Sequence, residues 1–182
     1  MSSRPYETTS VAIPGGTVVV VVDPDDGAVV ASGFADLATT FGFLSEAEQA
    51  RGHREVAPSA PSVRPAVEAL RDYADGDLAA LDRVAVRQTG GPFLQVAWTA
   101  LRQVKAGETD SYAGLAERAG RPRAVRAAGQ ACARNKVAPF VPCHRILRTD
   151  GSLGGYAYGL PVKEALLVHE GVRPAGEPVL FR

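Results

Sequence analysis

The hydrophobic pattern of the chain changes its period near residue 90, and this change constrains the fold more than any other feature. Val18–Val22 is a β-branched run of strand length, residues 23–27 are rich in turn-forming types, and Ala28–Ser32 can return as the second strand of a hairpin. Scattered proline and serine predict a loop over 52–63, and apolar residues at helical spacing predict a helix over 64–75. The first half therefore predicts a small sheet with a helix.

From Phe93 the apolar residues follow a helical period. We expect a helix that begins there and ends at Gly107, with Trp98 in its core-facing surface. Ser111 is expected to cap a second helix over Tyr112–Ala119. Arg123–Arg134, rich in alanine and glycine, is expected to form a third. Because a short glycine-containing turn joins the last two, the segment predicts a helix-turn-helix.

We therefore predict an α/β domain over residues 1–90 and a mainly α domain over residues 91–182. Residues 1–90 hold 7 basic and 13 acidic side chains, a net charge of −6, whereas residues 91–182 hold 13 basic and 7 acidic, a net charge of +6. A basic module suggests a polyanionic partner, nucleic acid first. A solvated basic face remains an open alternative.

Targeting signals and metal motifs are not evident. No apolar run approaches the roughly 20 residues that a membrane span requires, and the first residues lack the apolar core of a signal peptide. We expect a cytoplasmic protein with no membrane partner. Cys132 and Cys143 form neither a metal-ligand spacing nor a disulfide framework, so we expect no metal and a free thiol at Cys143.

The pentapeptide Val141–Arg145 places a thiol directly before an imidazole and a guanidinium. Thiol chemistry needs the thiolate, and a neighbouring base and a neighbouring cation both favour it. Pro142 fixes its own φ and restricts Val141, so Cys143 is presented on a stiff backbone. The alternative is a buried structural cysteine beside a solvent-facing basic pair.

Six landmarks in register carry a resemblance to a known family. They are Phe93 with Val96–Trp98, Gly107–Thr109 with Ser111 and Tyr112, Arg126–Ala127 with Asn135, Pro142–Arg145, Gly154–Tyr156 with Gly159–Leu160, and Lys163–Glu164 with His169–Gly171. Over Phe93–Gly171 the chain resembles the O6-alkylguanine-DNA alkyltransferases, also called methylated-DNA–protein-cysteine methyltransferases. The resemblance implies a ribonuclease-H-like N-terminal domain, a DNA-binding alkyl-transfer domain, a monomer, and no cofactor.

The resemblance also implies the chemistry. Cys143 would take an alkyl group from O6-alkylguanine, and from O4-alkylthymine, in double-stranded DNA, once per molecule. His144 would act as the base on the thiol through a water, and Glu170 would orient the imidazole. Tyr112 would donate toward the base, and Lys163 would lie near the reactive site.

Guanine inside a duplex cannot reach a buried thiol, so the nucleotide must be flipped out. The resemblance implies that Arg126 fills the vacated place and that the small-residue helix enters the minor groove. The DNA-binding residues implied are Ser111, Arg123, Arg126, Ala127, Ala131 and Asn135, the last as a hinge. Those implied for the base and alkyl pocket are Pro142, Ile146, Tyr156, Ala157, Tyr158 and Gly159.

The chain departs from the family pattern at several positions around the pocket. Lys136 stands where proline usually follows the asparagine, Ala138 and Pro139 change the pocket wall, and Tyr158 replaces a common glycine. Three other interpretations remain open: a non-catalytic alkyltransferase-like lesion-binding protein, a Cys-His-Glu thiol hydrolase, and a plain helix-turn-helix regulator. The last should carry more base-reading side chains on its recognition helix.

Overall fold

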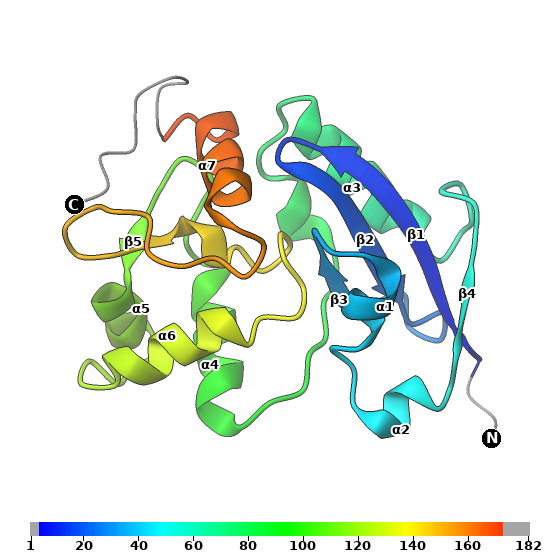
Figure 1. Ribbon diagram of the computed structural model, residues 1–182, viewed down its shortest axis with the longest axis horizontal. Coiled ribbons are helices and arrows are strands. Elements are labelled where there is room, and N and C mark those ends of the chain that lie inside the picture. The colour runs from blue at the N-terminus through cyan, green and yellow to red at the C-terminus, as the bar shows by residue number, and fades with distance from the viewer. Residues whose placement is uncertain (1–3, 173–182) are drawn as a thin grey trace.

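The computed structural model describes residues 4–172. Its first part is a mixed four-stranded sheet of β1 (Tyr6–Ile13), β2 (Gly16–Val22), β3 (Val29–Gly33) and β4 (His53–Glu55), in the order β3-β2-β1-β4 (Figure 1). β2 pairs antiparallel with both neighbours, and β4 pairs parallel with β1 at one edge. The predicted hairpin is confirmed as β2 and β3.

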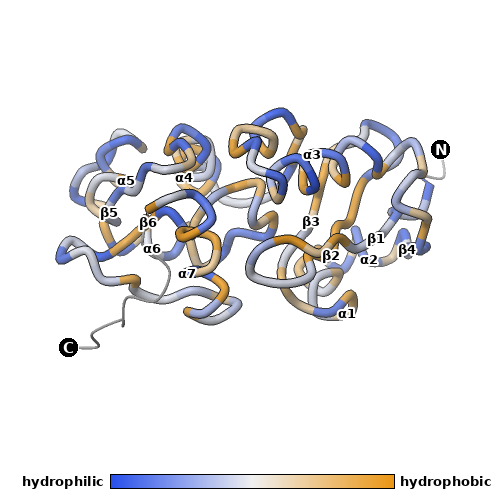
Figure 2. The backbone as a smooth tube through the Cα atoms, turned by 90° about the horizontal axis from the view of Figure 1, so that it is seen from above, coloured by the Kyte–Doolittle hydropathy of each residue, from blue (hydrophilic) through white to orange (hydrophobic). Residues whose placement is uncertain are grey.

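Both faces of β2 are buried, which explains its continuous run of valines. Val18, Val20 and Val22 pack into one apolar cluster with residues of α3 (Arg64–Ala74). Val21 points to the other face and packs with Tyr6. That second face carries α1 (Leu37–Phe41), with α2 (Glu46–Gln49) following it in the chain. Figure 2 shows α3 and α1 on opposite sides of the strands.

The helix predicted over 64–75 is confirmed as α3, whereas two strands of this sheet, β1 and β4, were not predicted. β1 carries buried polar residues, among them Thr8 and Thr9, so its sequence lacks a clear apolar alternation. The prediction of a loop throughout 52–63 is wrong at β4, whose three residues are all exposed. An exposed edge strand is held by backbone hydrogen bonds and leaves no hydrophobic pattern.

The second part is mainly helical, with α4 (Pro92–Leu101), α5 (Tyr112–Arg118), α6 (Val125–Ala133) and α7 (Leu160–His169). The chain also forms the 3₁₀ turns η1 (Ala80–Arg83) and η2 (Cys143–Arg145), and the short parallel pair β5 (Asp110–Ser111) and β6 (Ile146–Leu147). Ser111 caps α5 as expected, since its hydroxyl accepts from Gly114 N at 3.0 Å. The expected helix from Phe93 to Gly107 is wrong in length, because α4 ends at Leu101.

α4 and α6 pack against each other, with one polar contact between them. The indole N–H of Trp98 donates to Ala131 O at 2.9 Å, and the ring itself is buried, as the sequence predicts. Tryptophan in a core usually finds such a partner for its N–H. Within residues 4–172, no helix is both long and apolar enough to cross a bilayer.

The two parts are joined along the outer edge of β3. Ser32 N donates to Lys136 O at 2.8 Å, and the Ser32 hydroxyl donates to Ala138 O at 2.8 Å. At the start of β3, Val29 exchanges backbone hydrogen bonds with Ala85 and Arg87. One cluster of buried apolar residues includes members of the sheet, α3, α4, α6 and α7. The domain boundary between residues 90 and 91 stays a prediction, and residues 173–182 of its second domain lie outside the described residues.

Candidate active site

Cys143 lies at the start of a buried turn. The three residues of η2 have exposed fractions of 8%, 0% and 2%, in the order Cys143, His144, Arg145. Backbone hydrogen bonds close the turn, from Cys143 N to Val141 O at 2.9 Å and from Arg145 N to Pro142 O at 3.1 Å. The alternative of a solvent-facing basic pair is therefore wrong.

The carboxylate of Glu170, just after α7, gathers the side chains of this turn. His144 Nε2 lies 2.8 Å from Glu170 Oε1. Arg145 donates from Nε to Oε2 and from Nη2 to Oε1, both at 3.0 Å. The hydroxyl of Tyr73, on α3, also donates to Oε1 at 2.9 Å. A buried charge is tolerated only with such complete pairing.

These contacts fix the protonation states. Burial opposes the charge on Glu170, but hydrogen bonds from His144 and Arg145 outweigh it and lower the pKa of Glu170 to about 2. Burial lowers the pKa of His144, against the pull of Glu170, so the imidazole is neutral. A neutral ring that donates from Nε2 to Glu170 carries its lone pair on Nδ1. That atom has no hydrogen-bond partner among the described residues.

The thiol has a donor of its own. The side-chain Nδ2 of Asn135 lies 3.2 Å from Cys143 Sγ and 2.7 Å from Val141 O. Burial raises the pKa of Cys143, while the Asn135 amide and the positive charge of Lys163 act against that rise. The thiol therefore stays protonated at neutral pH until a base removes its proton.

Cys143 opens into a cavity of about 310 Å³. The cavity is lined by Tyr112, Gly129, Cys132, Ala133, Cys143, Gly155, Tyr156 and Ala157. Its volume falls within the range of small-molecule sites. Burial raises the pKa of Tyr112, so its hydroxyl keeps a proton to donate.

Cys132 is a second thiol in the same cavity, and sequence analysis assigned it no role. Burial raises its pKa strongly, and the nearby Cys143 adds to the rise. Burial also raises the pKa of Cys143, but the Asn135 amide donates to Cys143 Sγ and favours its thiolate.

Lys163, on α7, is completely buried. Its Nζ donates to Ile146 O at 2.6 Å and to the carbonyl of Leu153. The amine thus ties the strand after the cysteine to the loop that carries Tyr156. No group of three or more metal-binding side chains occurs within residues 4–172.

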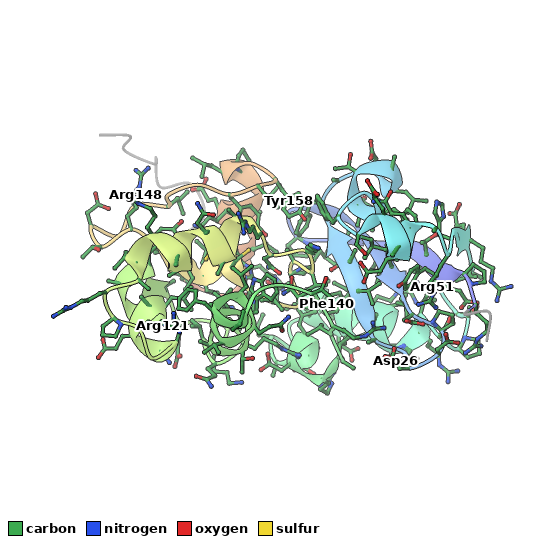
Figure 3. All side chains as sticks on the ribbon, turned by 90° about the horizontal axis from the view of Figure 1, so that it is seen from below. Asp26, Arg51, Arg121, Phe140, Arg148 and Tyr158 are labelled. Carbon is green, nitrogen blue, oxygen red and sulfur yellow. The ribbon has the colours of Figure 1, made fainter. Side chains whose placement is uncertain are left out.

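Only some of the residues predicted to form the pocket line the cavity at Cys143. Tyr156 and Ala157 line the cavity with Cys143. Tyr158, labelled in Figure 3, lines an adjoining cavity of about 410 Å³. Its ring lies edge-on to that of Phe34, with the ring centroids 5.6 Å apart. Pro142 and Ile146 are buried, and Gly159 precedes α7. None of these three is among the lining residues of the first cavity.

Of the six residues predicted to bind DNA, Ser111 caps α5 and the other five divide into two groups. Arg123, Arg126 and Ala127 line an open groove of about 490 Å³ on α6. Within residues 4–172, neither of these arginines forms an ion pair. Ala131 is fully buried on the inner face of α6, so the prediction that its side chain contacts DNA is wrong. Asn135 is also buried and faces the thiol.

Sequence reasoning assigned no role in the site to Tyr73 and a different role to Arg145. Tyr73 lies 97 residues before Glu170, and its helical spacing predicted only a core position. Arg145 was read as a cation that favours the thiolate, whereas it holds Glu170. A tyrosine or arginine among apolar residues offers no signal of a distant buried partner.

Comparisons with known proteins agree on one family. Residues 92–172 match the family model described as 6-O-methylguanine DNA methyltransferase, DNA binding domain. A methylated-DNA–protein-cysteine methyltransferase of Methanosarcina acetivorans is 43% identical over 108 residues, which cover 59% of this chain and 69% of that protein. One of Salmonella typhimurium is 44% identical over 102 residues, covering 56% of this chain and 60% of that protein, less than two thirds of its length.

Two solved structures resemble most of the chain. The Mycobacterium tuberculosis O6-methylguanine methyltransferase has a TM-score of 0.72 at 28% identity, covering 94% of this chain and 95% of that one. A second structure, of Mycobacterium tuberculosis OGT in complex with DNA, has a TM-score of 0.71 at 28% identity, covering 93% and 95%. The similarity thus includes the sheet and α3 as well as the helical part.

Proposed function

The chain belongs to the methylated-DNA–protein-cysteine methyltransferase family, and on this premise we propose that Cys143 accepts alkyl groups directly from damaged DNA. The substrates are O6-alkylguanine and O4-alkylthymine in double-stranded DNA. Because the acceptor is the protein's own cysteine, each molecule reacts once. The protein acts in the cytoplasm as a monomer without a cofactor.

The chemical step is an in-line displacement at the alkyl carbon. A bond forms between Cys143 Sγ and this carbon as the bond from the carbon to guanine O6 breaks. The electron pair of the broken bond stays on the guanine, where the hydroxyl of Tyr112 donates toward N3. The thiol proton passes through a water to His144 Nδ1, and the ionised Glu170 stabilises the imidazolium that results.

DNA reaches this site with the damaged nucleotide flipped out from the minor groove. α5 and α6 form the helix-turn-helix, and the small residues of α6 allow the backbone to approach the groove closely. Arg126 is exposed and free of ion pairs within residues 4–172, which suits it to occupy the place that the nucleotide leaves. Arg123 and Ala127 line the same groove.

One observation carries the proposal. Cys143 opens into a cavity with Tyr112 and Tyr156, while the next residue, His144, is paired with a fully buried carboxylate. A structural cysteine would need neither the cavity nor the paired imidazole. Arg123 and Arg126 bring a basic groove to the helix that forms one wall of this cavity.

The test is intact-protein mass spectrometry after incubation with a duplex oligonucleotide that contains O6-methylguanine. We expect one added methyl group on the wild type and none on Cys143→Ser. Trypsin separates the two thiols, since Cys143 lies in the peptide Val137–Arg145 and Cys132 in Ala127–Arg134. Methylation of Cys132, or tight binding without a mass change, would overturn the proposal, the latter in favour of a lesion-binding protein.

A further inference from the structure

Gln88, in the connector before α4, contacts both residues of the Asn135–Lys136 pair with its side-chain amide. Its Nε2 donates to Asn135 Oδ1 at 3.2 Å, and its Oε1 accepts from Lys136 N at 2.9 Å. Gln88 is half-buried. Neither its position nor its sequence context marks it as part of a site.

Contacts with the sheet and with α4 hold the backbone at Gln88 in place. Arg87, the preceding residue, donates its backbone N–H to Val29 O at 2.9 Å, and its guanidinium pairs with Asp23 at 2.6 Å. On the other side, Gln95 Nε2 donates to the backbone carbonyl of Gln88 at 2.7 Å. The side chain therefore projects from an anchored backbone.

The orientation of the Asn135 side-chain amide determines whether its nitrogen or its oxygen faces the thiol. Its oxygen accepts from Gln88 Nε2 and from Val137 N, both at 3.2 Å, and its nitrogen donates to Val141 O and to Cys143 Sγ. A carboxamide donates only from nitrogen and accepts only at oxygen. If the amide were reversed, an oxygen would face the sulfur and would repel a thiolate.

We propose that Gln88 is a positioning residue that sets the direction of the Asn135 amide and so aims its NH₂ group at Cys143 Sγ. The inference rests on the proposed function for its consequence, which is a faster alkyl transfer. It concerns a residue outside the cavity that touches neither the sulfur nor the DNA base.

Several other titratable groups lie around the sulfur or in its turn, and a test must hold them constant. They are His144 in the same turn, Lys163 on α7, Cys132 on α6, Tyr112 on α5, and Tyr156 and Tyr158 on the loop before α7. Of these, the charge of Lys163 works in the same direction as the Asn135 amide. A substitution at Gln88 leaves all of them in place.

Two substitutions separate amide direction from packing. Gln88→Glu keeps the size of the side chain and the acceptor for Lys136 N, but it sets an oxygen against Asn135 Oδ1. Gln88→Leu removes both hydrogen bonds and fills a similar volume. Gln103→Glu is the matched control, since it makes the same change of charge at an exposed position.

The readout is the rate at which iodoacetamide alkylates the Val137–Arg145 peptide of the folded protein, followed across pH, together with methyl transfer from O6-methylguanine DNA. A hydrogen bond to a charged group predicts a loss of about tenfold at neutral pH for Gln88→Glu and about threefold for Gln88→Leu. The midpoint of the pH profile should move upward in the same order. Gln103→Glu should match the wild type.

The outcomes separate the two proposals. If Gln88→Glu leaves the iodoacetamide profile unchanged, or if Gln88→Leu shifts it as far or farther, the inference is overturned whether or not the wild type accepts methyl groups. If the profile shifts in the expected order but the wild type takes no methyl group from DNA, Gln88 positions the Asn135 amide and the proposed function fails alone.

Discussion

Glu170 carries a full charge in the protein interior, and hydrogen bonds from Arg145, His144 and Tyr73 stabilise that charge. Arg145 supplies the opposite charge through two hydrogen bonds, which leaves His144 neutral and able to accept a proton at Nδ1. Tyr73 contributes a neutral donor from the other half of the chain. Loss of any one donor leaves a charged oxygen less well satisfied, because water does not reach it.

The first prediction concerns Tyr73→Phe. The substitution keeps the ring but removes the donor to Glu170, so we expect the free energy of unfolding to fall by about 1.5–3 kcal/mol. Urea unfolding followed by circular dichroism measures this change.

Tyr156→Phe is the matched control for that prediction. The hydroxyl of Tyr156 is buried and has no hydrogen-bond partner among the described residues, so its removal should leave stability unchanged or slightly increased. Equal losses for the two variants would show that the contact with Glu170 does not stabilise the fold.

At the level of elements, the sequence predicts best where one face of an element is apolar. The period of Val67, Leu70 and Tyr73 placed α3 within a residue of its observed ends. β4 was missed because all its residues are exposed, and β1 because threonines and a glutamate occupy buried positions. The predicted helix is longer than α4 because Val104 is buried although it lies in the turn after the helix. A buried residue in a turn gives the same apolar signal as one within a helix.

The candidate site was predictable only in part, for a related reason. Cys143, His144 and Arg145 are adjacent, so their proximity needs no fold, and Glu170 was found through the resemblance. Tyr73 lies 97 residues before its partner Glu170. Gln88 lies 47 residues before its partner Asn135. Such contacts depend on how helices and strands pack, and a single sequence does not contain that information in local form.

The second prediction belongs to α6. Arg126→Ala should slow methyl transfer from duplex DNA by about tenfold or more, because unstacking a base costs a few kcal/mol that an inserted side chain helps to offset. Transfer from a single-stranded oligonucleotide should be much less affected. Single-turnover kinetics on both substrates measure the ratio.

Arg71→Ala controls for the loss of a positive charge at an exposed site outside this groove. If Arg126→Ala lowers both rates equally, Arg126 acts through general attraction to DNA and not through base flipping.

At the scale of the whole molecule, an acidic half and a basic half share one cluster of buried apolar residues and are joined by specific polar and aromatic contacts. Ser32 pairs with the segment before the cysteine, Tyr73 binds Glu170, and Tyr158 packs against Phe34 with its hydroxyl 3.4 Å from Ser32 O. The contact at Tyr73 reaches Glu170 of the candidate site, and Lys136 and Tyr158 line the adjoining cavity. The shape of the site therefore depends on the N-terminal half.

The third prediction is an acid-induced loss of stability that centres on Glu170. Its pKa is lowered to about 2 in the fold, so its contribution is present above the unfolded value near 4.5 and is lost as pH falls toward 2. The loss amounts to at most about 3 kcal/mol, since one pKa unit corresponds to 1.36 kcal/mol. His144, with its pKa lowered, adds a separate loss below about 6.5.

Denaturant unfolding at pH 7, 5 and 3 tests this prediction. Glu170→Gln should be less stable than the wild type at pH 7 and should lose less stability between pH 5 and pH 3. Parallel curves for the two proteins in that interval would assign the acid sensitivity to other carboxylates, such as Asp23 and Glu7.

The fourth prediction tests the contact between the halves at Tyr158. A Cβ atom added at Gly33 would lie 1.9 Å from the Tyr158 hydroxyl oxygen, so Gly33→Ala must displace the ring. We expect a loss of about 1–3 kcal/mol in the free energy of unfolding. In a Tyr158→Gly background the same substitution should cost much less. Thermal unfolding of the four proteins gives the coupling, and additive losses would contradict it.

The same contact implies a rule for how related sequences diverge. The Tyr158 hydroxyl occupies the space of a missing side chain at Gly33, although 125 positions separate the two residues. Neither position can change freely without regard to the other. Relatives with an aromatic residue at position 158 should keep glycine at position 33. Relatives with glycine at position 158 should admit larger residues at position 33. An alignment of many relatives would then show the two columns covarying.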